Sequence, residues 1–131
     1  MIEAWSPRLL SVLRIVAAFL YLLHGTQKVF AVPPTASGAT VQLASRLGAA
    51  GVIEIVGGSL ILLGLFTRPV AFVCAGEMAF AYFLVHAPRA PLPLQNGGEL
   101  PVLFCFIFLY LAAAGGGPWS LDALRSRRGR A

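Results

Sequence analysis

Four long apolar runs, separated by short polar connections, dominate the pattern of hydrophobic and polar residues along the chain. We expect membrane-spanning helices at about residues 9–30, 47–66, 70–87 and 99–114, because roughly 20 apolar residues suffice to cross the hydrocarbon core of a bilayer. The connections contain the prolines, glycines and charged residues that end helices. The pattern predicts an all-α integral membrane protein, with residues 1–131 forming a single four-helix bundle.

Local signals predict where these segments begin and end. Ser6 is a candidate N-cap and Pro7 a suitable first helical residue for the first span. Residues 32–46 are small and polar with two prolines, so we expect an external loop there, with a short surface helix inside it left open. The turn at 67–69 is so short that the second and third spans must be antiparallel neighbours. Prolines and glycines in 88–98 predict a loop without regular helix.

The carboxyl-terminal segment carries a topology signal. Glycines and a proline at 115–118 end the fourth span, and Ser120 can cap a short amphipathic tail that begins at Leu121. Four arginines follow in this tail. Together with Arg8 and Arg68 they outnumber the basic residues on the opposite side, so the positive-inside rule predicts that both termini are cytoplasmic.

Composition excludes a soluble protein. Hydrophobic residues make up 58% of the 131 residues and charged residues only 11%, with a mean hydropathy of +0.81, far from the usual range of soluble domains. The net charge of +5 is concentrated in the carboxyl-terminal tail, which favours a topology signal over a nucleic-acid partner. Cys74 and Cys105 are isolated thiols inside predicted spans, so we expect core residues and no metal site.

Ionisable residues inside the apolar runs are the main clue to function. A charge at the middle of a membrane helix costs about 2.5 to 3.5 kcal/mol even on the lenient insertion scale. Seven such residues lie within or at the edge of the predicted spans: Arg14, His24, Lys28, Glu54, Glu77, His86 and Glu99. Because they carry both signs and lie on different helices, we expect them to be partners across the bundle interior.

The first span presents a polar stripe. Successive helical residues rotate by about 100°, which brings Arg14, Tyr21, His24 and Lys28 onto one face, and this face is expected to point into the bundle. By its depth in the bilayer, Glu77 is the first choice as partner of Arg14. An arginine and a carboxylate in a low dielectric attract strongly and can form two parallel hydrogen bonds.

The remaining glutamate then needs a partner of its own. If Arg14 binds Glu77, Glu54 requires Lys28, His24 or a proton, because an isolated carboxyl in an apolar site tends to become neutral. Arg14, Glu54 and Glu77 are therefore candidate catalytic residues that exchange protons. An equally weighted alternative is that they are structural pins that set the register of the helices.

A second group of polar residues is expected at the outer mouth of the bundle. His24, Lys28, His86, Asn96 and Glu99 are candidate binding residues there, with hydrogen-bonding and proton-transfer capacity that suits a quinone headgroup or a small oxyanion. Structural explanations compete with this hypothesis. An acid in the first turn of a helix meets the positive end of the helix dipole, and a lysine near the membrane surface can extend its charge to water.

Several short motifs together resemble one known family. They are Leu13-Arg14, His24-Gly25 with Gln27-Lys28, Glu54-Ile-Val-Gly-Gly58, Leu63-Gly-Leu-Phe-Thr-Arg68, Glu77-Met78, Asn96-Gly-Gly-Glu99 and Trp119-Ser-Leu-Asp122. Across nearly the whole chain they resemble the DoxX family, which includes DoxX- and DoxD-like small four-helix membrane proteins. The resemblance implies a multi-pass bundle in the bacterial cytoplasmic (inner) membrane. Relatives include a membrane subunit of a thiosulfate:quinone oxidoreductase and partners of redox enzymes, and others are associated with resistance to quinones or thiol stress.

The expected function follows from the polar residues and this resemblance. We expect a membrane subunit of a quinone-linked redox system that binds quinone or docks an oxidoreductase partner in the lipid bilayer, and whether the chain is itself an enzyme stays open. The sequence has no haem-type histidine pair, flavin motif or iron-sulfur cysteine set, so we expect no covalently bound cofactor and at most a bound quinone. The alternatives are a proton-coupled small-molecule transporter or exporter and a noncatalytic scaffold. A homo-oligomer is compatible with each.

Overall fold

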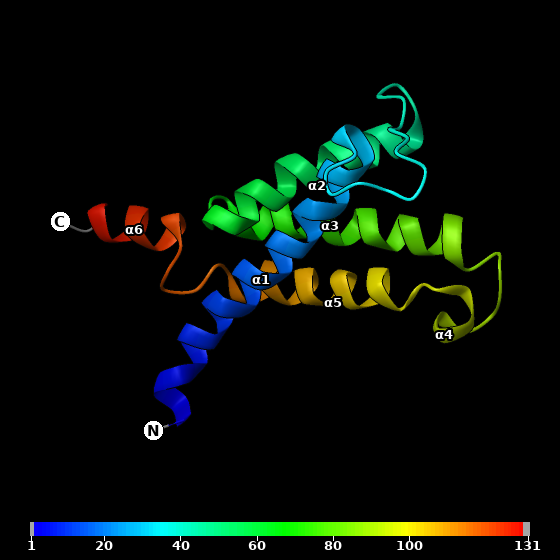
Figure 1. Cartoon of the computed structure of the whole chain (residues 1–131). Helices are drawn as coiled ribbons and strands as arrows, with labels where there is room; N and C mark the ends of the chain where they lie inside the picture. The colour runs from blue at the N-terminus through cyan, green and yellow to red at the C-terminus, as the bar shows by residue number, and fades with distance from the viewer. Residues whose placement is uncertain (1, 130–131) are drawn as a thin grey trace.

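The computed structural model describes residues 2–129, and every regular element in that part of the chain is a helix (Figure 1). The elements in order are α1 (Ile2–Phe30), α2 (Arg46–Leu63), α3 (Thr67–Ala81), the π-helical segment η1 (Tyr82–His86), α4 (Pro93–Asn96), α5 (Glu99–Ala114) and α6 (Leu121–Arg128). Four of these, α1, α2, α3 with η1, and α5, form the bundle.

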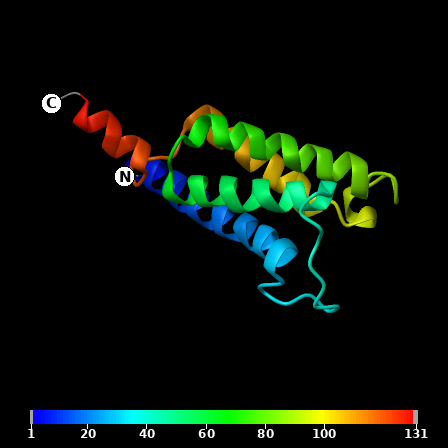
Figure 2. The same ribbon diagram turned by 90° about the horizontal axis from the view of Figure 1, so that it is seen from above.

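The bundle has two distinct ends. α1 packs along α2, α3 packs along α5, and α2 and α3 are antiparallel neighbours joined by the turn at 64–66. Both described termini, this turn and residues 115–120 lie at one end, which we call the terminal end (Figure 2). The connections 31–45 and 87–98 lie at the opposite end, the loop end.

Aromatic and small residues hold the bundle together. Between α1 and α5, the ring of Tyr21 packs 4.8 Å from that of Phe108 and 5.8 Å from that of Phe104. Between α1 and α2, a Cβ atom added at Gly58 would lie 3.1 Å from the Cβ of Leu22, so the glycine allows close approach of the two backbones. Close packing at small residues is typical of membrane helices.

The outer surface of the bundle is strongly apolar. Phenylalanines on α3, η1 and α5 are among its most exposed residues, including Phe72, Phe80, Phe83 and Phe106. Three helical stretches, Glu3–Phe30, Arg46–Leu63 and Thr67–His86, are long and apolar enough to cross a membrane, while α5 is apolar but shorter. The expected membrane helical bundle is therefore confirmed, with three to four spanning helices.

The first helix begins earlier than expected. α1 starts at Ile2, so Ser6 is not its N-cap and Pro7 lies inside the helix. The missing N–H of Pro7 removes only the bond to the carbonyl of Glu3, which is in the exposed first turn. A proline this close to a helix start is tolerated because few hydrogen bonds precede it.

Most other helix ends agree with their local signals. The Ser45 hydroxyl accepts a hydrogen bond from the Gly48 N–H at the start of α2, and the Ser120 hydroxyl accepts one from the Ala123 N–H at the start of α6. Gly64 ends α2 in the left-handed conformation, with φ of 68°. The Ser120 cap confirms the expected short tail helix, and the short turn between packed helices confirms the antiparallel hairpin of α2 and α3.

The two connections at the loop end differ from each other. Residues 31–45 contain turns and bends but no helix. The expectation that 88–98 excludes regular helix is wrong for one turn, because Pro93 at the first helical position opens α4. Its fixed φ favours a helix start while its ring prevents the helix from extending towards the amino terminus.

Candidate functional site

A buried ion pair joins α1 to α2 in the interior of the bundle. The Nζ atom of Lys28 lies 2.6 Å from Oε1 of Glu54. Glu54 is 1% exposed, whereas the side chain of Lys28 is 29% exposed. A Cβ added at Gly25 would lie 2.8 Å from the Cβ of Glu54, so the absence of a side chain at Gly25 lets α2 bring its carboxyl close to α1. Lys28 is the single lysine of the chain.

A second polar pair joins α1 to α3. The hydroxyl of Tyr21 donates a hydrogen bond of 3.0 Å to Oε2 of Glu77. Tyr21 is fully buried, and its ring is fixed by Phe104 and Phe108 from α5. Because aromatic packing holds the ring and the hydroxyl reaches the carboxyl, the position of Glu77 is determined by α1 and α5 together.

The two pairs belong to one cluster. Tyr21, which bonds Glu77 on α3, also packs against α2 at Gly57, one helical turn from Glu54 and its partner Lys28. Tyr21 lies between α2 and α3, because a Cβ added at Gly57 would lie 2.5 Å from Sγ of Cys74 and 4.0 Å from the Tyr21 ring. We call Tyr21, Lys28, Glu54 and Glu77 the carboxyl cluster.

One oxygen of the cluster has no partner. Oε2 of Glu54 is buried and accepts no hydrogen bond from the described residues. Leaving a buried polar atom unpaired costs about 1 to 3 kcal/mol, and more when the group is charged. Such an atom is expected to take a proton or to meet a bound polar group.

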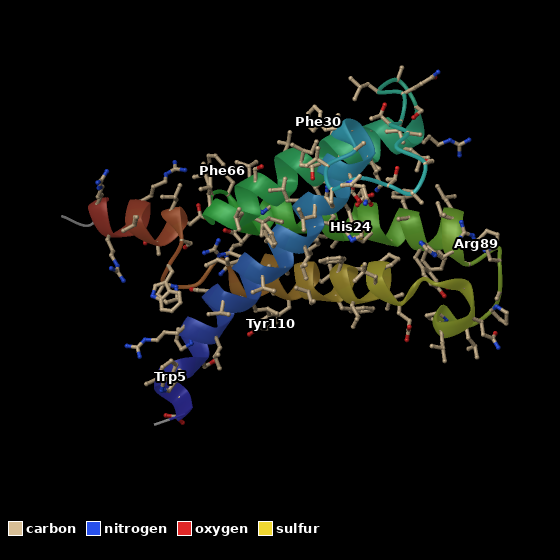
Figure 3. The ribbon with its side chains drawn as sticks, in the orientation of Figure 1. Trp5, His24, Phe30, Phe66, Arg89 and Tyr110 are labelled. Atoms are coloured by element: carbon tan, nitrogen blue, oxygen red, sulfur yellow. The ribbon has the colours of Figure 1, made fainter. Side chains whose placement is uncertain are left out.

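His24 lies on the same face of α1, one turn from the residues of the cluster. It is half-buried, and its ring packs edge-on against Phe104 at 6.1 Å between centroids. Figure 3 shows it between α1 and the neighbouring helices. The expected inward orientation of the stripe formed by Arg14, Tyr21, His24 and Lys28 is thus confirmed by the burial of these residues.

The expected pairing of Arg14 with Glu77 is wrong. Arg14 is fully buried at the terminal end, where its guanidinium donates to four backbone carbonyls and to no carboxyl. Nε donates to Gly116 at 2.8 Å, Nη1 to Ile61 at 2.7 Å and also to Leu62, and Nη2 to Trp119 at 2.8 Å.

The binding of Arg14 to backbone carbonyls has a physical explanation. The carbonyls of Ile61 and Leu62 belong to the last turn of α2, where the backbone lacks helical partners and the helix dipole is negative. Those of Gly116 and Trp119 belong to the irregular segment after α5. A guanidinium has five N–H donors in a fixed fork, so one side chain satisfies both segments and joins α1, α2 and the start of α6.

Asp122 completes the terminal end and was not among the expected site residues. Its carboxylate accepts hydrogen bonds from the backbone N–H groups of Phe66 and Thr67, at 2.9 and 2.8 Å, and its own N–H donates to the Gly64 carbonyl. Phe66 has a φ of 50°, an unfavourable conformation for a residue with a side chain. The carboxylate therefore stabilises a strained turn and caps α3.

The environment of Asp122 favours its charged form. Burial alone would raise the pKa of this carboxyl, but the hydrogen bonds from Thr67 and Phe66, together with the charge of Arg125, outweigh burial and lower the pKa. Arg125 also lies over the ring of Phe66, 4.9 Å from its centroid. The docking of α6 on the α2–α3 turn thus depends on an ionised Asp122.

Three residues expected at the outer mouth, His86, Asn96 and Glu99, lie at the loop end. Nδ1 of His86 lies 3.0 Å from the Asn96 carbonyl, and the Asn96 side chain donates to the Ala90 carbonyl and accepts from the Gly98 N–H. Glu99 is exposed in the first turn of α5. Within residues 2–129, no hydrogen bond or ion pair connects these three residues to Lys28. His86 and Asn96 therefore form a structured turn at the loop end, and their expected role in ligand binding stays a prediction.

Comparison with known proteins decides the family. The DoxX family model matches residues 9–87, which include the carboxyl cluster. An uncharacterized protein of Haemophilus influenzae is 45% identical over 125 residues, covering 92% of this chain and 93% of that protein. No solved structure matches the chain. This chain belongs to the DoxX family.

The cluster gives this DoxX protein a specific chemical capacity. Lys28 and Tyr21 donate hydrogen bonds, while Glu54 and Glu77 accept them or exchange protons. Lys28 and Glu77 are half-buried, whereas Tyr21 and Glu54 are buried, so Lys28 connects the buried carboxyl of Glu54 to the surface. Among the described residues, no group of three histidines, cysteines or acids is placed to hold a metal ion.

Tyr21 is the residue of this DoxX site that is absent from both the expected catalytic and the expected binding residues. Its position seven residues after Arg14 places it on the polar stripe, and this was the available signal. A tyrosine in an apolar helix is usually explained by packing, however, and only the contact with Glu77 on α3 shows its polar role.

Proposed function

We propose that this DoxX protein is the membrane subunit of a quinone-linked redox system in the bacterial cytoplasmic membrane, with the carboxyl cluster as its headgroup site. The observation that carries the proposal is the unpartnered Oε2 atom of Glu54, beside Lys28 in a nearly water-free interior. A quinone headgroup presents polar oxygens that match this arrangement of donors and acceptors. Glu54, Glu77, Lys28 and Tyr21 are the residues assigned to it, with His24 beside them.

Proton balance suits the cluster to this chemistry. Reduction of a quinone to its hydroquinone converts two carbonyl groups into two hydroxyl groups, and a partner oxidoreductase supplies the two electrons. Glu54 and Glu77 each give one proton from the protonated form of the carboxyl, and the carboxylate left on Glu54 then pairs with Lys28. The Tyr21 hydroxyl holds Glu77 in place. Both carboxylates are reprotonated from water after the reaction, and oxidation of the hydroquinone reverses each transfer.

The orientation in the membrane follows from the basic residues at the two ends. Arg8, Arg68 and the arginines of α6 lie at the terminal end, where Trp5 and Phe66 are also seen (Figure 3). The positive-inside rule assigns that end to the cytoplasm. Lys28 lies towards the loop end of α1, so protons would be exchanged with the outer side of the cytoplasmic membrane.

Binding of a short-chain quinone to the purified protein tests this function. Glu54→Gln keeps the shape of the side chain but replaces one carboxyl oxygen by an NH2 group, which alters the hydrogen bonds to the headgroup and to Lys28, so we expect affinity to fall by about tenfold or more. Glu3→Gln is the matched control, because Glu3 is exposed in the first turn of α1, at the other end of the bundle. Equal affinities in the wild type and Glu54→Gln would reject the site.

A proton-coupled transporter is the second candidate. It is favoured by the two carboxyls on the neighbouring helices α2 and α3, which could carry a proton with a substrate. In liposomes, transport coupled to a pH gradient and abolished in both Glu54→Gln and Glu77→Gln would support this candidate. Quinone binding without any such flux would support the redox function instead.

A further inference from the structure

An apolar groove runs along the outside of the bundle between α2 and α3. Its volume is about 400 Å³. The residues that line it on α2 include Val52, Val56, Gly57 and Leu60, and those on α3 include Val73 and Cys74. The groove is therefore open to the hydrocarbon of the bilayer and offers almost no polar surface.

Small residues create the floor of this groove. Gly57 has no side chain, and a Cβ there would lie 2.5 Å from Sγ of Cys74. Directly behind them is the ring of Tyr21, 4.0 Å from the same position. Only this thin layer separates the groove from a residue of the carboxyl cluster.

The groove and the cluster lie in sequence along the two helices. α2 and α3 are antiparallel, and Gly57 faces Cys74. Glu54 lies about one helical turn from Gly57 towards the loop end, and Glu77 lies about one turn from Cys74 in the same direction. The groove therefore lies on the lipid-facing surface and extends along α2 as far as Val52 and Ile53, which is the level of Glu54 in the bundle.

We infer that this groove holds the polyisoprenoid tail of a lipid quinone, whose headgroup reaches the carboxyl cluster from the side, within the bilayer. The inference rests on the proposed function and narrows its substrate to membrane-borne quinones. In this inference the quinone enters from the side of the bundle and not through the loop end, where Asn96 and His86 are hydrogen-bonded to each other and Asn96 to the surrounding turn.

The depth of the carboxyl cluster in the bilayer favours a quinone in the groove over a phospholipid or a second copy of this chain. Glu54 is eight residues into α2, about 12 Å from its start, near the middle of the span. A phospholipid keeps its charged headgroup at the membrane surface, so its acyl chain would leave Oε2 of Glu54 unpaired. A second copy of this chain would cover the groove with apolar side chains and also leave that oxygen unpaired. A quinone has a polar, uncharged headgroup that can reside within the bilayer.

Filling the groove tests the inference. Val56 and Val73 are 53% and 57% exposed, so Val56→Phe and Val73→Phe enlarge lipid-facing side chains without disturbing the core. We expect each to weaken binding of a long-tailed quinone by about tenfold. A tail-less quinone with the same headgroup should bind with unchanged affinity. Val16→Phe, on the lipid-facing side of α1 and 51% exposed, is the matched control and should change neither affinity.

The outcomes separate the inference from the proposed function. Failure of the tail-less quinone to bind the wild type rejects the headgroup site itself. Binding of both quinones without any effect of Val56→Phe and Val73→Phe overturns only the groove. A photoreactive group on the quinone tail should label α2 and α3. Labelling of α1 and α5 instead would also overturn the groove. The same holds if Val73→Cys forms a disulfide between two chains, which covers the groove, and quinone binding is unchanged.

Discussion

The two ends of the bundle bury charge in opposite ways. At the terminal end, the guanidinium of Arg14 is surrounded by carbonyls of α2 and of residues 116–119, and each of its nitrogens has a partner. Nearer the loop end, Glu54 is buried to the same degree, yet one of its two oxygens accepts no hydrogen bond from the described residues. The two side chains are therefore equally buried, but the hydrogen bonds of Arg14 are all made and those of Glu54 are not.

This difference in hydrogen bonding separates a buried residue with a structural role from one with a candidate chemical role. A buried charge whose hydrogen bonds are all made has its lowest free energy in that state, and moving it would cost several kcal/mol. A buried carboxyl with an unpaired oxygen gains free energy when it takes a proton or meets a ligand. Arg14, expected among the catalytic residues, is best explained as a structural residue, and Glu54 is the candidate for function.

The largest expected effect is at the terminal end. Arg14→Met removes all donors to four carbonyls, and the unfolding free energy in detergent should fall by about 3 to 5 kcal/mol. Arg68→Met is the control, because the exposed Arg68 donates to a single carbonyl, that of Ala113, and should cost less than about 1 kcal/mol. A loss at Arg14 as small as that at Arg68 would contradict the structural role.

A smaller loss of stability is expected for Lys28→Met. This change strands the carboxyl of Glu54, and because Lys28 is partly exposed the loss should be about 2 to 3 kcal/mol. The double variant Lys28→Met with Glu54→Leu should recover most of this stability, because an apolar pair replaces the ion pair. It should not recover quinone binding. Recovery of both would show that the pair is only a structural pin.

Tyr21→Phe should change stability by about 1 kcal/mol, the value of one hydrogen bond, since the ring packing is kept. Quinone binding should fall more than stability does, because Glu77 loses its partner on α1. Tyr110→Phe provides the control, as Tyr110 is 54% exposed on α5. Parallel behaviour of the two variants in both measurements would remove Tyr21 from the site.

The smallest effect concerns Asp122 and pH. Its pKa in the folded protein is below the ordinary value of 3.8, so its contribution is fully present above that value and is lost as pH falls through the folded pKa. We expect a loss of about 1 kcal/mol, typical of a helix cap. Unfolding measured from neutral to acidic pH should show this loss in the wild type and in Glu3→Gln, and not in Asp122→Asn. The same acid-induced loss in Asp122→Asn would assign it to another group.

Much of the fold could be predicted from the sequence, because membrane helices depend on local composition. The apolar runs, the short turn before Pro69 and the Ser120 cap each have a local cause. The start of α1 could not be predicted as well, since Pro7 is compatible with either the first turn or a position slightly inside the helix.

The site was predictable only in part. The stripe on α1 follows from helical periodicity, and Lys28 was among the partners left open for Glu54. The partners of Arg14 could not be found in this way. Depth along the helix suggested Glu77, but a guanidinium also binds backbone carbonyls, and only the folded chain shows that the end of α2 and residues 116–119 present four of them to Arg14.

Infrared difference spectroscopy tests the central claim most directly, because it detects the carbonyl stretch of a protonated carboxyl. Two spectra of the protein in membranes would be compared, one with a bound short-chain quinone in its oxidised form and one with the same quinone in its reduced form. We predict a change in this carboxyl band that loses the Glu54 component in Glu54→Gln, keeps the Glu77 component there, and is complete in Glu3→Gln. A spectrum without such a change, or a band that survives unaltered in Glu54→Gln, would contradict proton exchange at Glu54.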